Sequence, residues 1–391
     1  MQKEKLVSSL NSKNRIFRHR ILKKLRKEIK EIESSDKTSL CLRSTYSFSS
    51  YSPSMLAYLG YKNGLGLAGI LDTETVEGAK EFLKGCKLFS IHGLVSADLR
   101  VKPHIADENF SICGIAGVSY GNLKIVSKFL KPYREKHKEQ VVGMVTELNK
   151  KLNAYKIRLS FLKDVFPLTK ALSGGTVTDR HVWLACSKKM IASFGKGEKL
   201  IKSLQKLGMA FSEEEITLLT DFDNYFYEFD FARILKQKFK IGIKVTPYYK
   251  DVIKFANEIN AISFYELRNS VSGNEEKIIG QVKDCGYDAL AFNPRKICEE
   301  ERKTLIDLCF KNQIIAIPLE VIDFPRKKFD TVLTEQESEI LNKNAWALKG
   351  HEKSVEKGGK GFKELGDVDF ERKIDILAGL VHPKYYEKQG E

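Results

Sequence analysis

Three apolar runs between residues 38 and 101 constrain the fold of this chain more than any other feature. Each run ends in polar residues, and the first two lead into a segment with helical spacing; the runs are TSLCLRSTYSFSSYSP (38–53), LGLAGILDTETVEGAKEFL (65–83) and FSIHGLVSADLRV (89–101). Strands that alternate with helices predict a parallel sheet. Because side chains that do chemistry project from the carboxyl ends of such strands, the candidate functional residues are Cys41, Arg43, Asp72, Thr73 and Val95.

The composition is that of a soluble globular protein. Hydrophobic residues make up 42% of the 391 residues and charged residues 30%, and no apolar run is long enough to span a membrane. The N-terminus is too charged for a secretory signal. Seven cysteines stand singly with no C-x-x-C pair, which predicts reduced thiols in a cytoplasmic protein rather than a zinc site or a disulfide framework.

The first 36 residues are basic, with eleven Lys and Arg against five Asp and Glu, in a chain of net charge +15. Ile21, Leu25, Ile29 and Ile32 recur at helical spacing, which predicts an amphipathic helix. Two interpretations stay open: a helix packed on the outside of the fold with its lysines in water, or an arm that binds nucleic acid or a membrane surface. We favour the packed helix, because Phe17 is the only aromatic residue among these charges.

The alternation of strands and helices continues after residue 101 and is interrupted once. Eight strands are expected, at 39–42, 67–71, 88–95, 110–118, 241–245, 261–265, 289–293 and 314–318. Between the fourth and the fifth strand the spacing is mainly helical, with a capping box formed by Ser212 and Glu215. This segment ends in a cluster of aromatic residues. We interpret the cluster as a core or a domain seam rather than a base-stacking platform, because acidic residues among them would repel a nucleic-acid backbone.

Short motifs spread over most of the chain carry a family resemblance. The most specific is GGTVTDRH at 174–181. The others are Tyr46-Ser47 before Tyr51-Ser52-Pro53, AGILD at 68–72 before Gly78, Gly93, Gly286-Tyr287-Asp288-Ala289, Pro325-Arg326, and Trp346-Ala347-Leu348 with Gly350-His351-Glu352. In this order they resemble the PHP (polymerase and histidinol phosphatase) superfamily of metal-dependent phosphoesterases, and within it a bacterial branch of standalone PHP-domain proteins.

The resemblance implies a fold and a division of the chain. The fold would be α/β, a distorted (β/α)7-type PHP barrel with a helical insertion and a basic N-terminal helix. The parts would be a helical arm (1–37), the first half of the barrel (38–121), the insertion (122–240), the second half of the barrel (241–330) and a C-terminal helical appendage (331–391).

The resemblance also implies a metal site, which this chain keeps only in part. PHP enzymes hydrolyse phosphate esters with clustered divalent ions such as Zn, Mn, Fe or Mg, held by imidazoles and carboxylates at the strand ends. Asp72 and His181 match ligand positions and would be the catalytic and metal-binding residues. The remaining positions fall on Cys41, Arg43, Val95, Val321 and Asp323. Of these, only Cys41 and Asp323 could replace a metal ligand, so the motif set is degenerate.

Arg43 allows two interpretations. A guanidinium has no lone pair to give and repels a divalent ion. It could therefore bind a phosphate or carboxylate together with Ser47, Arg180 and Arg326. We favour instead a buried ion pair with Asp72, which would otherwise be a lone carboxylate in a closing pocket. A nearby cation also lowers a thiol pKa, but no histidine base is placed beside Cys41, which disfavours a cysteine nucleophile.

These residues lead to three hypotheses of function. The first is a pseudoenzyme of the PHP type that needs no cofactor, hydrolyses little or nothing, and binds a phosphorylated or anionic small molecule or a protein partner. The second is a phosphoesterase with one divalent metal on Asp72, His181 and Asp323. The third is a nucleic-acid-associated protein that uses the basic arm. No membrane partner is expected, and nothing in the sequence predicts the oligomeric state.

Overall fold

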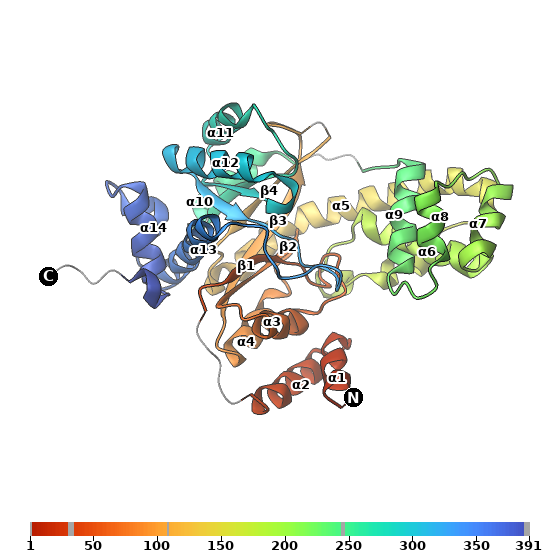
Figure 1. Ribbon diagram of the computed structural model, residues 1–391, viewed down its shortest axis with the longest axis horizontal. Coiled ribbons are helices and arrows are strands. Elements are labelled where there is room, and N and C mark those ends of the chain that lie inside the picture. Colours follow the sequence, from red (N-terminus) through yellow and green to blue (C-terminus); the bar gives the residue numbers. More distant parts are fainter. Residues whose placement is uncertain (1, 30–34, 108, 244–246, 387–391) are drawn as a thin grey trace. The chain divides into compact units, whose positions relative to one another are not determined.

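The computed structural model describes residues 2–29, 35–107, 109–243 and 247–386 (Figure 1). The chain divides into two compact units, which we call the barrel unit (Met1–Lys131 with Val245–Glu391) and the helical unit (Pro132–Lys244). Each unit is described by itself below. Within the described residues, no helix combines the length and the apolar character needed to cross a membrane.

A seven-stranded sheet forms the centre of the barrel unit. Its strands lie in sequence order: β1 (Thr38–Leu42), β2 (Leu67–Thr73), β3 (His92–Val101), β4 (Ser111–Ala116), β5 (Ile262–Leu267), β6 (Ala289–Phe292) and β7 (Ile315–Pro318). A parallel bridge between Leu42 and Ile322 brings the chain after β7 back to β1. Two hydrogen bonds make this closure, from the Arg43 amide to the Ile322 carbonyl (3.0 Å) and from the Ile322 amide to the Cys41 carbonyl (2.9 Å). The sheet is therefore a nearly closed barrel of the expected α/β class.

Three expectations about the strands are wrong. The sheet is not wholly parallel, because β4 runs antiparallel to both β3 and β5. The expected strand at 241–245 is absent from residues 241–243, and its last two residues lie outside the described part of the chain. The third strand also begins later than expected. The helix before it ends at Leu88, and Ser90 turns the chain with a φ of 54° before β3 starts at His92.

Helices cover the outside of the barrel (Figure 1). Those of the barrel unit are α1 (Gln2–Ser8), α2 (Arg15–Lys27), α3 (Pro53–Lys62), α4 (Ala79–Leu88), α10 (Tyr249–Glu258), α11 (Glu275–Asp284), α12 (Glu299–Lys311), α13 (Glu335–Glu356) and α14 (Phe370–Gly379). Helix α5 (Leu123–Leu152) starts in the barrel unit and continues into the helical unit. The core of the barrel unit contains apolar residues of the strands together with α13 and α14, including Trp346, which is 1% exposed.

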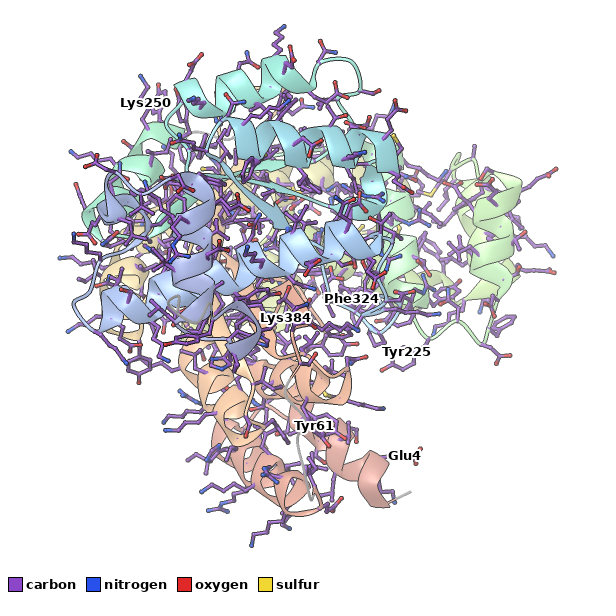
Figure 2. All side chains as sticks on the ribbon, turned by 60° about the vertical axis from the view of Figure 1, so that its left-hand side comes forward. Glu4, Tyr61, Tyr225, Lys250, Phe324 and Lys384 are labelled. Atoms are coloured by element: carbon purple, nitrogen blue, oxygen red, sulfur yellow. The ribbon has the colours of Figure 1, made fainter. Side chains whose placement is uncertain are left out.

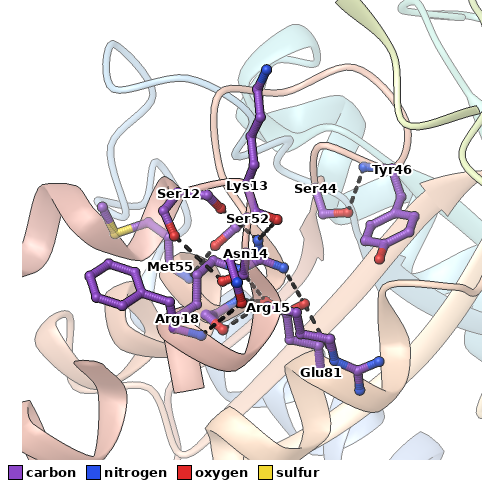
Figure 3. Close-up of polar contacts among 12 residues, drawn as sticks. Ser12, Lys13, Asn14, Arg15, Arg18, Ser44, Tyr46, Ser52, Met55 and Glu81 are labelled. Atoms are coloured by element: carbon purple, nitrogen blue, oxygen red, sulfur yellow. Dashed lines mark hydrogen bonds and ion pairs between the residues drawn. The ribbon is translucent and has the colours of Figure 1, made fainter. Parts of the chain in front are cut away.

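The basic N-terminal segment forms a packed helix, as favoured from the sequence. Helix α2 buries Ile21, Leu22 and Leu25 and packs against α3 and α4. Arg18 lies on the same buried face and pairs with Glu81 of α4, with Nε to Oε1 at 2.8 Å and Nη2 to Oε2 at 2.5 Å (Figure 3). The helix ends at Lys27, so Ile29 lies beyond it, and Ile32 lies outside the described residues.

The helical unit has its own core. It contains the end of α5 and the helices α6 (Asp179–Phe194), α7 (Gly197–Lys206), α8 (Glu213–Thr220) and α9 (Tyr227–Phe239). The predicted capping box is present: the Glu215 amide donates to Ser212 Oγ at 3.2 Å, and the Ser212 amide donates to Glu215 Oε2 at 2.9 Å. The aromatic cluster divides by position, since Tyr227 and Phe231 are core residues whereas Phe222 and Tyr225 are exposed.

Candidate functional site

Charged side chains gather around the ends of several barrel strands. Arg43 follows β1, and Thr73 ends β2, opposite Asp98 of the parallel neighbour β3. Glu266 lies near the end of β5. Because the parallel register sets the ends of β1, β2 and β3 side by side, residues far apart in the sequence meet here. We call Arg43, Asp72, Asp98 and Glu266 the strand-end cluster.

Arg43 is held on two sides. Its Nη1 donates to Thr73 Oγ1 at 2.8 Å and to Asp98 Oδ1 at 3.2 Å, and its Nη2 donates to Asp98 Oδ2. The pair is buried, with side-chain exposures of 11% for Arg43 and 2% for Asp98. Burial opposes the charge on Arg43, but Asp98 beside it raises the pKa of the guanidinium well above its usual value, so it stays protonated. The favoured ion pair with Asp72 is therefore wrong: the partner is Asp98.

Asp72 is instead held by two serines. Its Oδ1 accepts from the Ser44 amide at 2.7 Å and from Ser47 Oγ at 2.9 Å, and its Oδ2 accepts from Ser44 Oγ at 2.5 Å. Burial raises the pKa of Asp72, and the hydrogen bonds from Ser44 and Ser47 offset part of that rise. Ser47, predicted to bind substrate, thus donates to Asp72.

Glu266 has the least saturated carboxyl group of the cluster. Its Oε2 is buried and accepts no hydrogen bond from the described residues. Burial and the nearby negative charge of Asp98 raise the pKa of Glu266 to about 7, while Arg43 opposes this rise. A carboxyl group with such a pKa can take up or release a proton near neutrality.

Cys41 does not behave as the neighbouring arginine suggested. The thiol is 1% exposed. Burial raises the pKa of Cys41 well above its ordinary value, and Arg43 lowers it only in part. The idea that Arg43 makes Cys41 a thiolate is therefore wrong, because the loss of solvent outweighs one cation that is already paired with Asp98.

Asp323 lies after β7 and is buried. Its main-chain carbonyl accepts from Ser49 Oγ at 2.6 Å and from the Ser50 amide at 3.1 Å, which ties this end of the barrel to the loop after β1. The charge of Asp323 is also near enough to Cys41 to act on the pKa of that thiol. The carboxyl groups of Asp323 and Asp72 are thus both buried near the closure of the barrel, although their predicted role as metal ligands stays a prediction.

Arg180 and His181 belong to the helical unit. His181 is the third residue of α6 and completes a capping box, in which the Thr178 amide donates to its Nδ1 at 3.0 Å. Burial lowers the pKa of His181 to about 4, so the ring is neutral at pH 7. The predicted functional roles of Arg180 and His181 stay predictions.

The donor set around Arg43 does not fit a divalent metal ion. The guanidinium lies on Asp98, and Asp72 is saturated by Ser44 and Ser47. Across the described ranges, no three side chains of His, Cys, Asp or Glu stand close enough together to hold an ion. Arg43 thus occupies a position among carboxylates that a cation would need.

A basic cavity of about 190 Å³ lies beside the ends of β6 and β7. Four cationic side chains line it, namely Arg295, Arg326, Lys327 and Lys328. Two carboxylates, Glu320 and Asp330, also line it and approach Arg295 at 3.4 Å and 2.8 Å. The lining has an excess of positive charge, and it includes Arg326, which was predicted to bind substrate.

Asp98, Glu266 and Arg295 were not among the site residues predicted from the sequence. Asp98 is the single carboxylate of the third apolar run, where polar and apolar residues alternate from Ser96 to Val101, and this pattern was the available signal; the resemblance pointed to Val95 instead. Glu266 directly follows an expected strand and could have been found by the same rule of strand ends.

Comparisons with known proteins bear on the fold. No family model and no curated protein matches the chain. A provisionally assigned metal-dependent phosphoesterase from Bifidobacterium adolescentis is similar in structure, with 14% identity over 79% of this chain and 97% of that one and a TM-score of 0.55. An amidohydrolase from Chromobacterium violaceum, whose structure holds sulfate and no metal, has 10% identity over 77% of this chain and 95% of that one and a TM-score of 0.52. The chain therefore shares the barrel fold of these two proteins.

Proposed function

We propose that this protein is a degenerate relative of PHP phosphoesterases that binds a phosphorylated or otherwise anionic small molecule and hydrolyses it little or not at all. The observation that carries the proposal is the buried pair of Arg43 and Asp98 at the strand ends. A metal-dependent hydrolase of this fold needs free carboxylates and imidazoles at that place. In this protein the guanidinium of Arg43, which stays charged, lies at that place.

Electrostatics supports the loss of metal chemistry. A guanidinium and a divalent ion about 4 Å apart would repel each other by roughly 8 kcal/mol, twice the value of about 4 kcal/mol for unit charges at an effective dielectric constant near 20. Arg43 also cannot donate a lone pair to a metal. Metal binding would thus require the ion pair with Asp98 to break, which would leave a buried charge without its partner.

The basic cavity supports the binding of an anion. Arginine forms bidentate hydrogen bonds with phosphate and carboxylate groups, and lysine adds positive charge. Arg326 and Lys327 line the cavity at the rim of the barrel, where ligands of such folds usually bind. An anion bound in the cavity would balance the excess of positive charge, since four cationic side chains and two carboxylates line it.

The test of lost catalysis measures metal and turnover together. Protein loaded with Mn, Zn, Fe or Mg and then desalted should hold far less than one ion per chain by elemental analysis. Its activity on a panel of phosphate monoesters and diesters should equal that of Asp72→Ala. One tightly bound ion per chain, with turnover that Asp72→Ala abolishes, would contradict this proposal and support the single-metal alternative on Asp72, His181 and Asp323.

The test of anion binding uses inorganic phosphate and nucleoside monophosphates in titration calorimetry. Arg326→Gln combined with Lys327→Gln should weaken binding about tenfold or more, because hydrogen bonds to charged groups contribute about 1.5–3 kcal/mol. The matched control is Lys303→Gln with Lys311→Gln, two exposed lysines of α12, which should leave the affinity unchanged. Equal weakening in both variants would show that the cavity is not the site.

A cytoplasmic location stays part of the proposal. All seven cysteines are free thiols, and five of them are buried. Free thiols fit a reducing compartment.

A further inference from the structure

The basic N-terminal segment forms a fixed surface that the barrel does not explain. One face of α2 is buried against α3 and α4, and the opposite face points outward. That outward face consists of Ile16, Phe17, Arg20, Lys23, Lys24 and Lys27, and Lys13 lies just before the helix; all seven residues are exposed. A helix of 13 residues is about 20 Å long, so the cations are spread over that distance.

Helix α4 extends this surface. Its Gly85 lies against α2 and α3, since a Cβ there would meet Leu22 at 3.4 Å and Ala57 at 2.6 Å. The neighbouring Lys84 is exposed. Burial lowers the pKa of the half-buried His19, and the nearby cations Lys23, Lys84 and Arg15 lower it further.

Few negative charges lie within these two helices. Helix α2 contains no acidic residue, and the only one in α4 is Glu81, which is buried against Arg18. Within the residues that the structure describes, Arg20, Lys23, Lys24 and Lys84 form no ion pair. Figure 2 shows nitrogen-tipped side chains projecting outward from the helices around Tyr61.

Helix α2 is attached to the rest of the barrel unit through the buried Arg18. Beyond its two contacts with Glu81, Arg18 donates from Nη1 to the carbonyls of Ser12 at 2.6 Å and Lys13 at 3.1 Å, and Glu81 Oε1 accepts from Ser54 Oγ at 2.7 Å (Figure 3). In the same view the Lys13 side chain extends away from this network. The backbone that carries the cations is thus attached to the barrel unit before a partner arrives, so binding need not order the helix.

We propose that the outward faces of α2 and α4 bind the phosphate backbone of a nucleic acid. In duplex DNA, about 20 Å of axis carries about six phosphates per strand, which matches the length of the cationic face. An anionic membrane fits less well. The apolar side of α2 that would enter lipid is already buried in the protein, with Ile21 4% and Leu25 1% exposed, which leaves Ile16 and Phe17.

The test measures binding of fluorescent nucleic acids by anisotropy between 50 and 300 mM KCl. The probes are a 20-nucleotide RNA, a 20-base-pair DNA duplex, and vesicles with anionic phosphatidylserine. The test variant replaces four exposed cations: Arg20→Gln, Lys23→Gln, Lys24→Gln and Lys84→Gln. The wild type should bind nucleic acid with a steep salt dependence, and the slope of log affinity against log salt should fall by about 3 in the variant.

The matched control removes the same charge elsewhere in the barrel unit. It replaces four exposed lysines of α11 and α12: Lys277→Gln, Lys283→Gln, Lys303→Gln and Lys311→Gln. This control should keep the wild-type slope. An equal loss in both variants, no salt-dependent binding, or binding to vesicles without binding to nucleic acid would each overturn the proposal. None of these results bears on the barrel, whose metal and anion tests are separate.

Discussion

Arg43 lies near two buried carboxyl groups whose surroundings differ. Asp98 accepts hydrogen bonds from both terminal nitrogens of the guanidinium, Nη1 and Nη2, and Nη1 also donates to Thr73. Glu266 is close enough for Arg43 to stabilise its charge, but its Oε2 accepts no hydrogen bond from the described residues. Because Arg43 is already paired with Asp98, it stabilises the charge of Glu266 only in part. Ionisation of Glu266 therefore costs free energy in the folded state.

This arrangement predicts how stability depends on pH. The folded pKa of Glu266 is raised from 4.5 to about 7, so the folded state binds more protons than the unfolded state between these values. The stability that Glu266 contributes is full below about pH 4.5 and is lost as the pH rises through 7, by roughly 3 kcal/mol. Glu266→Gln does not ionise, so its free energy of unfolding should rise relative to the wild type between pH 5 and pH 8.

Urea unfolding of the wild type and of Glu266→Gln at pH 5 and at pH 8 checks this prediction. Glu276→Gln is the control, since Glu276 is exposed on α11, and its difference from the wild type should be the same at both pH values. A Glu266→Gln difference that also stays constant would show that the protonation of Glu266 does not change on folding.

The sequence could identify some of these residues but could not pair them. Asp72 was placed at the end of the second strand and lies there. Its partners were expected to include Arg43, yet the register sets Thr73 opposite Asp98 and brings Asp98 to Arg43 instead. Which carboxylate meets a cation depends on a few ångströms across the sheet, which local sequence does not encode.

Two helices at the C-terminal end approach each other at one glycine. A Cβ on Gly350 of α13 would lie 1.7 Å from the Leu377 carbonyl oxygen of α14. Gly350→Ala should therefore push the helices apart and lower the free energy of unfolding by about 2–3 kcal/mol, despite the better helix propensity of alanine. Thermal or urea unfolding followed by circular dichroism measures the change.

The matched control is Gly280→Ala in the interior of α11. Apart from the backbone of its own helix, nothing lies within 4 Å of a Cβ there, so this substitution should stabilise the protein by about 0.5–1 kcal/mol. If both substitutions stabilise the protein, α13 and α14 do not pack as closely as the structure shows.

Most of the strands could be predicted from the sequence. Seven of the eight expected strands exist, because apolar runs that end in polar residues mark buried strands well. The antiparallel direction of β4 could not be predicted, since a buried strand has the same pattern of apolar residues whether its neighbours are parallel or antiparallel. The expected strand at 241–245 was wrong over 241–243, where a short apolar alternation has no strand to pair with.

At the scale of the whole chain, each unit has its own core and its own tryptophan. The chain contains two tryptophans: Trp183 is buried in the core of the helical unit and Trp346 in that of the barrel unit. Separate cores allow separate unfolding.

We expect two unfolding transitions in urea. Trp346→Phe leaves Trp183 as the reporter of the helical unit, and Trp183→Phe leaves Trp346 as the reporter of the barrel unit. The fluorescence midpoints of the two variants should differ, and circular dichroism of each variant should show both transitions. Coincident midpoints with a single transition by both methods would mean that the two cores unfold as one.

The sequence by itself determined the kinds and order of most elements, the buried face of α2, and the presence of Asp72 at a strand end. These follow from periodicity and composition, which act over a few residues. Only the tertiary structure decided that Arg43 pairs with Asp98, that Asp72 is held by Ser44 and Ser47, and that Lys84 joins the cations of α2. Those outcomes depend on strand register and helix packing, which bring together residues that are distant along the chain.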